Sequence, residues 1–182
     1  MKLHTRIFVP SKCPTHSLTH HEQFTFTLTS SSPFFTYTQI YLIQQSTGSY
    51  VEGDKLTVVM DRSPYGQFGI ELLDDLFVPA GFIAVGQDMR GTGLSEGRFS
   101  NWKADANDSE DLGDWIIQQP WSNGKIYTFG ASADGLGAFT TNYNAPSWLE
   151  SQYYIWTSSI GYEVIYPNGA LLYNLLNRWI TG

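Results

Sequence analysis

The sequence predicts a domain of the α/β class, with a mostly parallel sheet and helices on both of its faces. From residue 56 onward the segments alternate as strand, helix, strand, helix, strand, helix, strand. Crossovers of this length join parallel strands and place helices against the sheet. The apolar runs are continuous, which is typical of strands buried on both faces. With 182 residues, 42% of them hydrophobic, the chain is long enough for one domain with a substantial core.

Four short apolar runs are expected to form the strands of this sheet. They are rich in β-branched and aromatic residues, as buried strands are. The expected strands are residues 56–60, 82–86, 125–130 and 153–156. The turn after the first of them is expected at residues 61–66.

Four further segments carry apolar residues at helical spacing and are expected to be helices. In the first of them acidic residues separate the apolar ones, which gives the helix one apolar face. Acidic residues fill the first half of the second helix, which suits a helix N-terminus. Pro79, Pro120 and Pro146 follow the first three segments and end them. The expected helices are residues 70–78, 104–119, 136–144 and 169–180.

Residues 1–55 are expected to add strands and Ser/Thr-rich loops to the same domain. Short strands are predicted at residues 3–9, 24–28 and 39–43, the second of which alternates with period two. Three histidines cluster in this part of the chain: His16, His20 and His21. No carboxylate or cysteine of suitable spacing accompanies them, so a solvated loop is favoured over a metal site.

Composition and charge exclude several classes of function. The formal net charge is −7, from 10 Lys and Arg against 17 Asp and Glu, so nucleic acid is a poor candidate partner. Cys13 is the only cysteine, which rules out an internal disulfide and a zinc site built from cysteines. We expect no signal peptide and no membrane-spanning segment, because no apolar run has the required length. Compartment and oligomeric state are left open.

The segment 125–135 is the strongest candidate for a functional site. It predicts a strand that ends at Gly130, a sharp turn with Ser132 at its tip, and small residues that can open a helix. A serine on a tight strand-to-helix turn is a nucleophile elbow, whose hydroxyl stands above the sheet. The N–H of Ala133 points to where an oxyanion would form. The second glycine comes one residue later than in Gly-x-Ser-x-Gly, and the alternative is a turn that merely lets a helix pack on a strand.

Three unusual loops are expected to meet at one edge of the sheet. They follow predicted strands and span residues 63–66, 88–97 and 130–135. Ligand sites in parallel sheets lie at the carboxyl ends of the strands, so this convergence favours a functional elbow. A nucleotide-binding domain that uses the glycines of the last two loops is disfavoured, because neither loop carries the Lys-Ser/Thr of a phosphate loop.

Several separate motifs occur in the order and spacing of a known family. They are residues 62–66, 81–85, 87–97, 119–125 and 130–135, with Asp111 and Trp115 between the third and the fourth. On these motifs the chain resembles the Xaa-Pro dipeptidyl-peptidase and cocaine-esterase group of α/β-hydrolases, over about residues 56–160. In this family the second glycine of the elbow also comes one residue late. The family commonly has an aromatic residue directly after the nucleophile, where this chain has Ala133.

The resemblance implies a role for individual residues. Ser132 would attack a carbonyl carbon and form an acyl-enzyme, with the Ala133 N–H and the Tyr65 hydroxyl as the two oxyanion donors. Asp88 and Arg90 are expected to form a structural ion pair. Asp134 is interpreted as a helix-start or substrate-facing carboxylate, because a triad acid cannot act from two residues past the nucleophile. No cofactor and no metal are expected, and the substrate is a small-molecule or peptide acyl compound.

The resemblance also implies what is missing from this chain. All four histidines precede Ser132, whereas the α/β-hydrolase order is Ser, then Asp or Glu, then His. The expected divisions are residues 1–55 as N-terminal strands and loops, 56–160 as the α/β-hydrolase core, and 161–182 as the start of a helical cap. We therefore expect an N-terminal part of a serine hydrolase, truncated before the cap and the C-terminal strands that carry the triad acid and His. The alternative is a catalytically inactive protein of the same fold, with a binding role or none.

Overall fold

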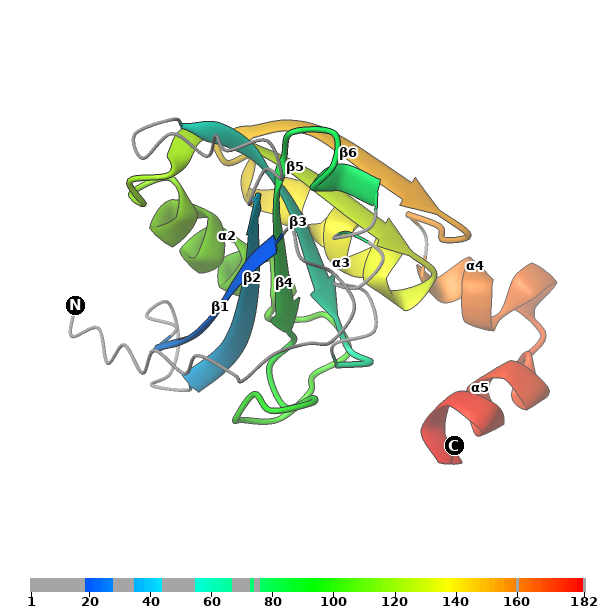
Figure 1. The fold of residues 1–182 in the computed structure, drawn as a ribbon. Helices are drawn as coiled ribbons and strands as arrows, with labels where there is room; N and C mark the ends of the chain where they lie inside the picture. The colour runs from blue at the N-terminus through cyan, green and yellow to red at the C-terminus, as the bar shows by residue number, and fades with distance from the viewer. Residues whose placement is uncertain are drawn as a thin grey trace.

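A computed structural model describes residues 19–27, 35–43, 55–66, 73, 76–159 and 161–181. Within them a six-stranded sheet has the order β1-β2-β4-β3-β5-β6 (Figure 1). Its strands are β1 (Thr19–Thr27), β2 (Phe35–Ile43), β3 (Leu56–Ser63), β4 (Ile83–Asp88), β5 (Ser122–Ala131) and β6 (Leu149–Ile155). Strands β4, β3, β5 and β6 pair in parallel, whereas β1 and β2 are antiparallel to their neighbours. The predicted mostly parallel sheet is confirmed.

The segments that connect the parallel strands contain helices, as predicted. They are α2 (Asp105–Ile116), α3 (Ala133–Thr140), α4 (Gly161–Ile165) and α5 (Tyr173–Thr181), with short 3₁₀ turns η1 (Thr141–Asn144) and η2 (Pro167–Gly169). Leu73, Leu76 and Phe77 are also helical, within the segment predicted as residues 70–78. Figure 1 shows α2 and α3 packed against the sheet, and α4 and α5 extending away from it.

The core lies on both faces of β3 because its side chains alternate. Val58 and Met60 pack in one buried cluster with Leu112 and Ile116 of α2. Val59 faces the opposite side, where it packs with Leu73. Period-two alternation in a strand whose two faces are both apolar produces this arrangement. The prediction of helices on both faces is therefore confirmed.

Two predicted elements differ from the observed ones. Strand β3 continues to Ser63 through the residues predicted as a turn, and Asp61, Arg62 and Ser63 are all buried. Arg62 and Ser63 have hydrogen-bond partners inside the molecule, so the change from apolar to polar residues did not end the strand. Strand β6 was predicted to be buried, but Tyr153 is 61% exposed. It lies at the edge of the described sheet, with β5 as its only partner there.

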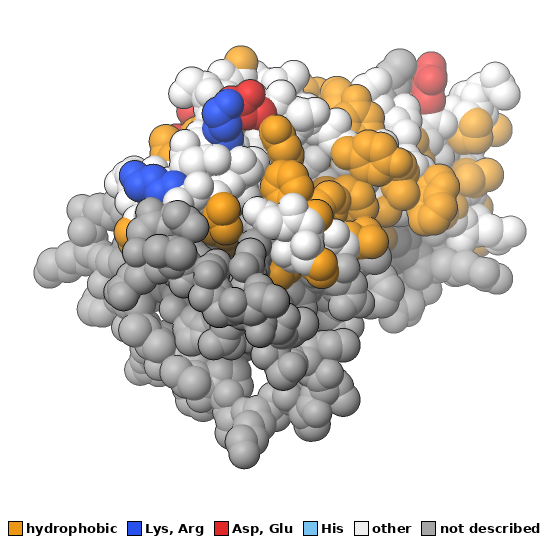
Figure 2. Space-filling model, turned by 45° about the horizontal axis from the view of Figure 1, so that its top comes forward, with side chains coloured by type: hydrophobic (Ala, Val, Ile, Leu, Met, Phe, Trp, Pro, Cys, Tyr) orange, Lys and Arg blue, Asp and Glu red, His pale blue; other side chains and the backbone are white. Residues whose placement is uncertain are grey.

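The surface beyond β6 is apolar. Figure 2 shows hydrophobic side chains gathered on one side of the described surface. The exposed ones near the C-terminal end are Tyr153, Tyr154, Trp156, Tyr162, Val164, Leu171, Leu172, Tyr173 and Leu175. Helix α5 begins at Tyr173, later than predicted. None of the helices in the described ranges has the length and apolarity that a membrane span requires. The strand predicted at residues 3–9 lies outside the described residues.

Candidate active site

Ser132 lies alone between a strand and a helix. Strand β5 ends at Ala131 and α3 begins at Ala133, so the turn has a single residue. Ser132 has φ 56° and ψ −116°, a conformation that costs a residue with a side chain on the order of 1–3 kcal/mol. Its N–H donates a hydrogen bond of 2.9 Å to the carbonyl oxygen of Ile155 at the end of β6. The surrounding structure therefore holds Ser132 in a strained conformation, at an exposed position.

The Ser132 hydroxyl is not used to cap the helix. A serine at the N-cap ordinarily accepts a hydrogen bond from an N–H in the first turn. Ser132 makes no such bond, since its backbone conformation is not that of a capping residue. Ala133 occupies the first helical position, where an N–H has no acceptor within the helix. The Ser132 hydroxyl therefore makes no capping bond, and the Ala133 N–H has no acceptor within the helix.

Close packing at Gly130 and Gly135 explains the unusual spacing of the two glycines in the elbow motif. A side chain at Gly130 would collide with the backbone of Asp134 and Gly135, so the end of β5 and the start of α3 press together. A Cβ atom at Gly135 would lie 2.9 Å from the Thr157 side chain and 3.3 Å from the Gly130 carbonyl oxygen. The late glycine is therefore required for the helix to pack against the strand ends.

Tyr65 lies in the turn after β3, and β3 is the parallel neighbour of β5. Its side chain is 48% exposed. Because parallel strands end at the same edge, Tyr65 and Ser132 both follow the carboxyl ends of adjacent strands. The Tyr65 N–H donates a hydrogen bond of 3.1 Å to the Ser63 hydroxyl oxygen. The structure thus brings both predicted loops to one edge of the sheet.

A pair of buried carboxylates lies beneath this edge. Asp134 is 8% exposed and Asp61, on β3, is 4% exposed. Burial raises the pKa of Asp134 to about 6, which a hydrogen bond with the Ser63 side chain partly offsets. Burial, and then repulsion by Asp134, raises the pKa of Asp61 well above its ordinary value. Asp134 is at the helix start, as predicted, but its carboxylate is buried rather than substrate-facing.

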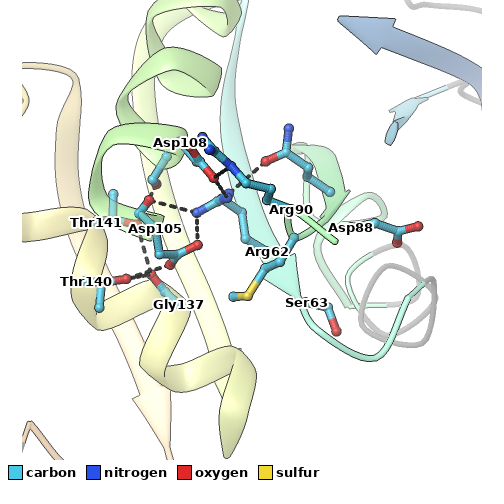
Figure 3. A network of polar contacts seen from close by, with 12 residues as sticks. Arg62, Ser63, Asp88, Arg90, Asp105, Asp108, Gly137, Thr140 and Thr141 are labelled. Atoms are coloured by element: carbon cyan, nitrogen blue, oxygen red, sulfur yellow. Dashed lines mark hydrogen bonds and ion pairs between the residues drawn. The ribbon is translucent and has the colours of Figure 1, made fainter. Parts of the chain in front are cut away.

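A second polar network joins β3 to the helices (Figure 3). Arg62 donates from Nη1 to the Asp105 carbonyl oxygen at 2.9 Å and forms an ion pair with the Asp105 carboxylate. Its Nε donates to Gln87 at 2.8 Å. The Thr140 hydroxyl of α3 donates to the same Asp105 carboxylate at 2.6 Å. Burial raises the pKa of Asp105, and the Arg62 guanidinium opposes that shift. Asp105 therefore connects β3, α2 and α3.

The predicted ion pair between Asp88 and Arg90 is wrong. Arg90 pairs with Asp108 of α2, to which its Nε donates at 3.0 Å. Asp88 accepts a hydrogen bond of 2.7 Å from the Leu94 N–H, within its own loop. Figure 3 shows the Asp88 carboxylate directed away from the arginine network. Arg90 lies beyond the end of β4 (Ile83–Asp88), so the alternation of the strand does not place its side chain on the face of Asp88.

The described residues place no histidine near the elbow. His20 and His21 lie on β1, four strand spacings from β5, and each spacing is about 4.8 Å. His4 and His16 lie outside the described residues. No group of three or more metal-ligating side chains occurs among the residues that the structure describes.

The family of the chain can be assigned by comparison. The whole chain, residues 1–182, matches the family described as X-Pro dipeptidyl-peptidase (S15 family). The chain belongs to this family. The predicted resemblance is therefore confirmed, and the family and its relatives carry the names of hydrolases.

Two curated relatives and one solved structure are similar to this S15-family chain. A Mycobacterium bovis protein named as a serine esterase is 42% identical over 64 residues, which are 34% of this chain and 10% of that protein. Cocaine esterase of Rhodococcus sp. is 35% identical over 85 residues, 43% of this chain and 15% of that protein. The S15-family chain thus spans only a small part of the length of these curated relatives.

The structural match concerns the fold. The crystal structure of an aminopeptidase from a marine-sediment Thaumarchaeota archaeon has a TM-score of 0.61 at 21% identity, and the match covers 79% of this chain and 27% of that one. Together with the strand order, this likeness gives the S15-family chain the α/β-hydrolase fold.

Sequence reasoning missed the polar groups behind the site. It treated Asp61, Arg62 and Ser63 as a turn, and it did not connect Asp134 with β3. One signal was available, because an Asp-Arg pair directly after a buried strand must find partners if the strand continues. The partners themselves depend on how β3, α2 and α3 pack.

Proposed function

We propose that the chain carries the nucleophile and the oxyanion donors of a serine hydrolase that acts on acyl compounds. Ser132 gives its proton to a base and attacks the acyl carbonyl carbon, and the carbonyl oxygen becomes the oxyanion of a tetrahedral intermediate. The leaving group departs from this intermediate with the proton, and water then hydrolyses the acyl-enzyme that remains. The Ala133 N–H and the Tyr65 hydroxyl donate to the oxyanion. The observation that carries the proposal is the strained, exposed Ser132 between β5 and α3.

The substrate belongs to one of two classes that the relatives' names represent. One is a peptide cleaved as an Xaa-Pro dipeptidyl-peptidase cleaves it, and the other is an ester. Both contain an acyl carbonyl group, so the same nucleophile and oxyanion donors serve either. We propose this broad acyl class for the present chain.

We also propose that the triad acid and His come from residues outside the described part of the molecule. The distance between β1 and β5 supports this, because His20 and His21 are too far from Ser132 to take its proton. The exposed apolar surface at β6 also supports it, since the edge strand could pair with further chain. We accordingly assign residues 161–182 to the start of a cap. Because no described histidine lies near Ser132, we expect the chain alone to react slowly.

The test is labelling with a fluorophosphonate, followed by intact mass spectrometry, with and without imidazole in the buffer. Imidazole can act as the missing general base. We expect one adduct per chain, faster adduct formation with imidazole, and no adduct on Ser132→Ala. Ser147→Ala, an exposed serine, is the matched control and is expected to label like the wild type.

Two results would count against the proposal. Equal labelling of Ser132→Ala would exclude Ser132 as the nucleophile. Fast labelling that imidazole does not accelerate would show that the chain already contains its base.

A further inference from the structure

The glycine-rich loop of residues 88–97 is bonded to the strand end that leads into the Tyr65 turn. The Met89 N–H donates a hydrogen bond of 2.9 Å to the carbonyl oxygen of Ser63, the last residue of β3. The Thr92 hydroxyl donates to the Met89 carbonyl oxygen at 2.9 Å and reaches the same Ser63 oxygen at 3.4 Å. The Tyr65 N–H donates to the Ser63 hydroxyl oxygen at 3.1 Å. The loop and the Tyr65 turn are thus both bonded to Ser63.

Asp88 folds this loop back on itself. Its carboxylate accepts a hydrogen bond of 2.7 Å from the Leu94 N–H, and the residue is only 3% exposed. The Ser95 hydroxyl donates to the Asp88 carbonyl oxygen, also at 2.7 Å. Gly93 has φ 52°, and a side chain there would collide with the Asp88 carboxylate. The loop is therefore closed around Asp88.

The folded loop also packs next to the Tyr65 turn itself. A Cβ atom at Gly66 would lie 3.9 Å from Asp88 Oδ1 and 4.0 Å from the Gly93 Cα atom, which are ordinary contact distances. Ser63 and Asp88 are partners in the register of β3 and β4, and Figure 3 shows them at neighbouring strand ends. Asp88 therefore lies close to the residue that follows Tyr65.

We propose that Asp88 is a positioning residue, which folds the loop 88–97 against the turn after β3 and so holds the Tyr65 hydroxyl where it donates to the oxyanion. The inference rests on the proposed function, because it requires Tyr65 to be an oxyanion donor. The Tyr65 side chain is half exposed, so the position of its hydroxyl depends strongly on the backbone of its turn. A misplacement of about 1 Å at a reacting group can cost about 100-fold in rate.

The test measures kinact and KI for a fluorophosphonate on the 182-residue chain, with imidazole as the base. We expect Asp88→Ala to lower kinact by about 10- to 100-fold and to leave KI nearly unchanged. In the Tyr65→Phe background the same substitution is expected to change kinact by less than about threefold, because the hydroxyl that Asp88 positions is already absent. Asp88→Asn retains an acceptor oxygen for the Leu94 N–H and is expected to react within about threefold of the wild type.

Two further variants make the comparison specific to the loop. Asp114 of α2 also accepts an N–H hydrogen bond, from Trp148 at 3.0 Å, so Asp114→Ala is the matched control and is expected to keep the wild-type kinact. Thr92→Val removes the hydroxyl that bonds to Met89 and Ser63 but leaves Asp88 in place. We expect it to lower kinact by at least about threefold when Tyr65 is present, and to have no effect in the Tyr65→Phe background.

The outcomes separate this inference from the proposed function. An equal loss from Asp88→Ala in both backgrounds, or no loss in either, would overturn the inference while Ser132 labelling stands. A wild-type rate for Tyr65→Phe would remove the donor role of Tyr65 and overturn the inference with it. Labelling of Ser132→Ala at the wild-type rate would instead overturn the proposed function. If circular dichroism shows that Asp88→Ala is unfolded, Thr92→Val decides by the same comparison of backgrounds.

Discussion

Ser132 illustrates how a single residue is held for chemistry. Its positive φ is unfavourable for a residue with a side chain, and its hydroxyl gives up the capping bond that would compensate. The hydrogen bond from its N–H to Ile155 and the close packing of Gly130 on α3 hold it there. Strain of this kind persists only where the surroundings impose it, so the conformation supports a catalytic role.

The contribution of Tyr65 can be tested by removing one oxygen atom. In Tyr65→Phe the ring is kept and the proposed oxyanion donor is lost. We expect the rate of p-nitrophenyl ester hydrolysis by the chain in imidazole buffer to fall by about 10²- to 10³-fold, the usual cost of one such donor. A change smaller than about threefold would assign Tyr65 to packing instead. Tyr143→Phe removes the hydroxyl of an exposed tyrosine outside the predicted loops and is the control.

The buried carboxylates predict a pH dependence of stability. The pKa of Asp134 is raised from 3.8 to about 6, so the folded chain holds this proton more tightly than the unfolded chain does. Its stabilising contribution is therefore complete below about pH 4 and is lost as the pH rises through about 6. Asp61 has a raised pKa and acts in the same direction. The loss from Asp134 is on the order of 3 kcal/mol.

Urea unfolding between pH 4 and pH 7 measures this effect. The free energy of unfolding of the wild type is expected to fall more steeply with rising pH than that of Asp134→Asn, in which the titrating group is absent. Parallel curves for the two proteins would show that Asp134 does not titrate in this range.

At the level of the elements, the Arg62 network fixes how α2 and α3 lie on β3. Removing one partner of a buried ion pair leaves an uncompensated charge. We expect Asp105→Ala to lower the free energy of unfolding by about 3–5 kcal/mol. Glu150→Gln breaks the exposed pair with Lys125 and is expected to cost less than about 1 kcal/mol. Urea titration of both variants checks the difference, and equal costs would contradict the structural role of the network.

Prediction from sequence located most of the strands and helices, but it missed the polar contacts between them. Apolar runs located β3, β4 and β5, and helical spacing located α2, because these patterns follow from burial of one element at a time. The end of β3 was missed because Asp61 and Arg62 look like turn residues until their partners are known. The approach of Asp134 to Asp61 depends on how α3 packs on β3, which periodicity does not contain.

The burial of β6 was mispredicted for a different reason. Its aromatic residues resemble those of a core strand, but the described sheet has no strand beyond it. An apolar composition therefore predicted a buried strand, whereas the observed strand lies at an exposed edge. The Ser132 turn was predictable because glycine spacing and a lone serine are local signals.

At the scale of the whole molecule, the apolar surface at β6, α4 and α5 predicts association of the isolated chain. Large exposed apolar patches are rare on monomers and promote self-association. Trp156 is 85% exposed and Leu175 is 47% exposed. We expect Trp156→Lys with Leu175→Lys to shift sedimentation velocity profiles toward the monomer at equal concentration. A wild-type chain that sediments as a monomer at all concentrations tested would contradict this prediction.

The central claim is that the Ser132 hydroxyl is the nucleophile, and peptide mapping of the phosphonylated chain tests it most directly. After labelling in imidazole buffer, the chain is digested and the modified residue is identified by tandem mass spectrometry. The account predicts that the phosphonyl group is on Ser132. A phosphonyl group found on another residue, with Ser132 unmodified, would contradict it.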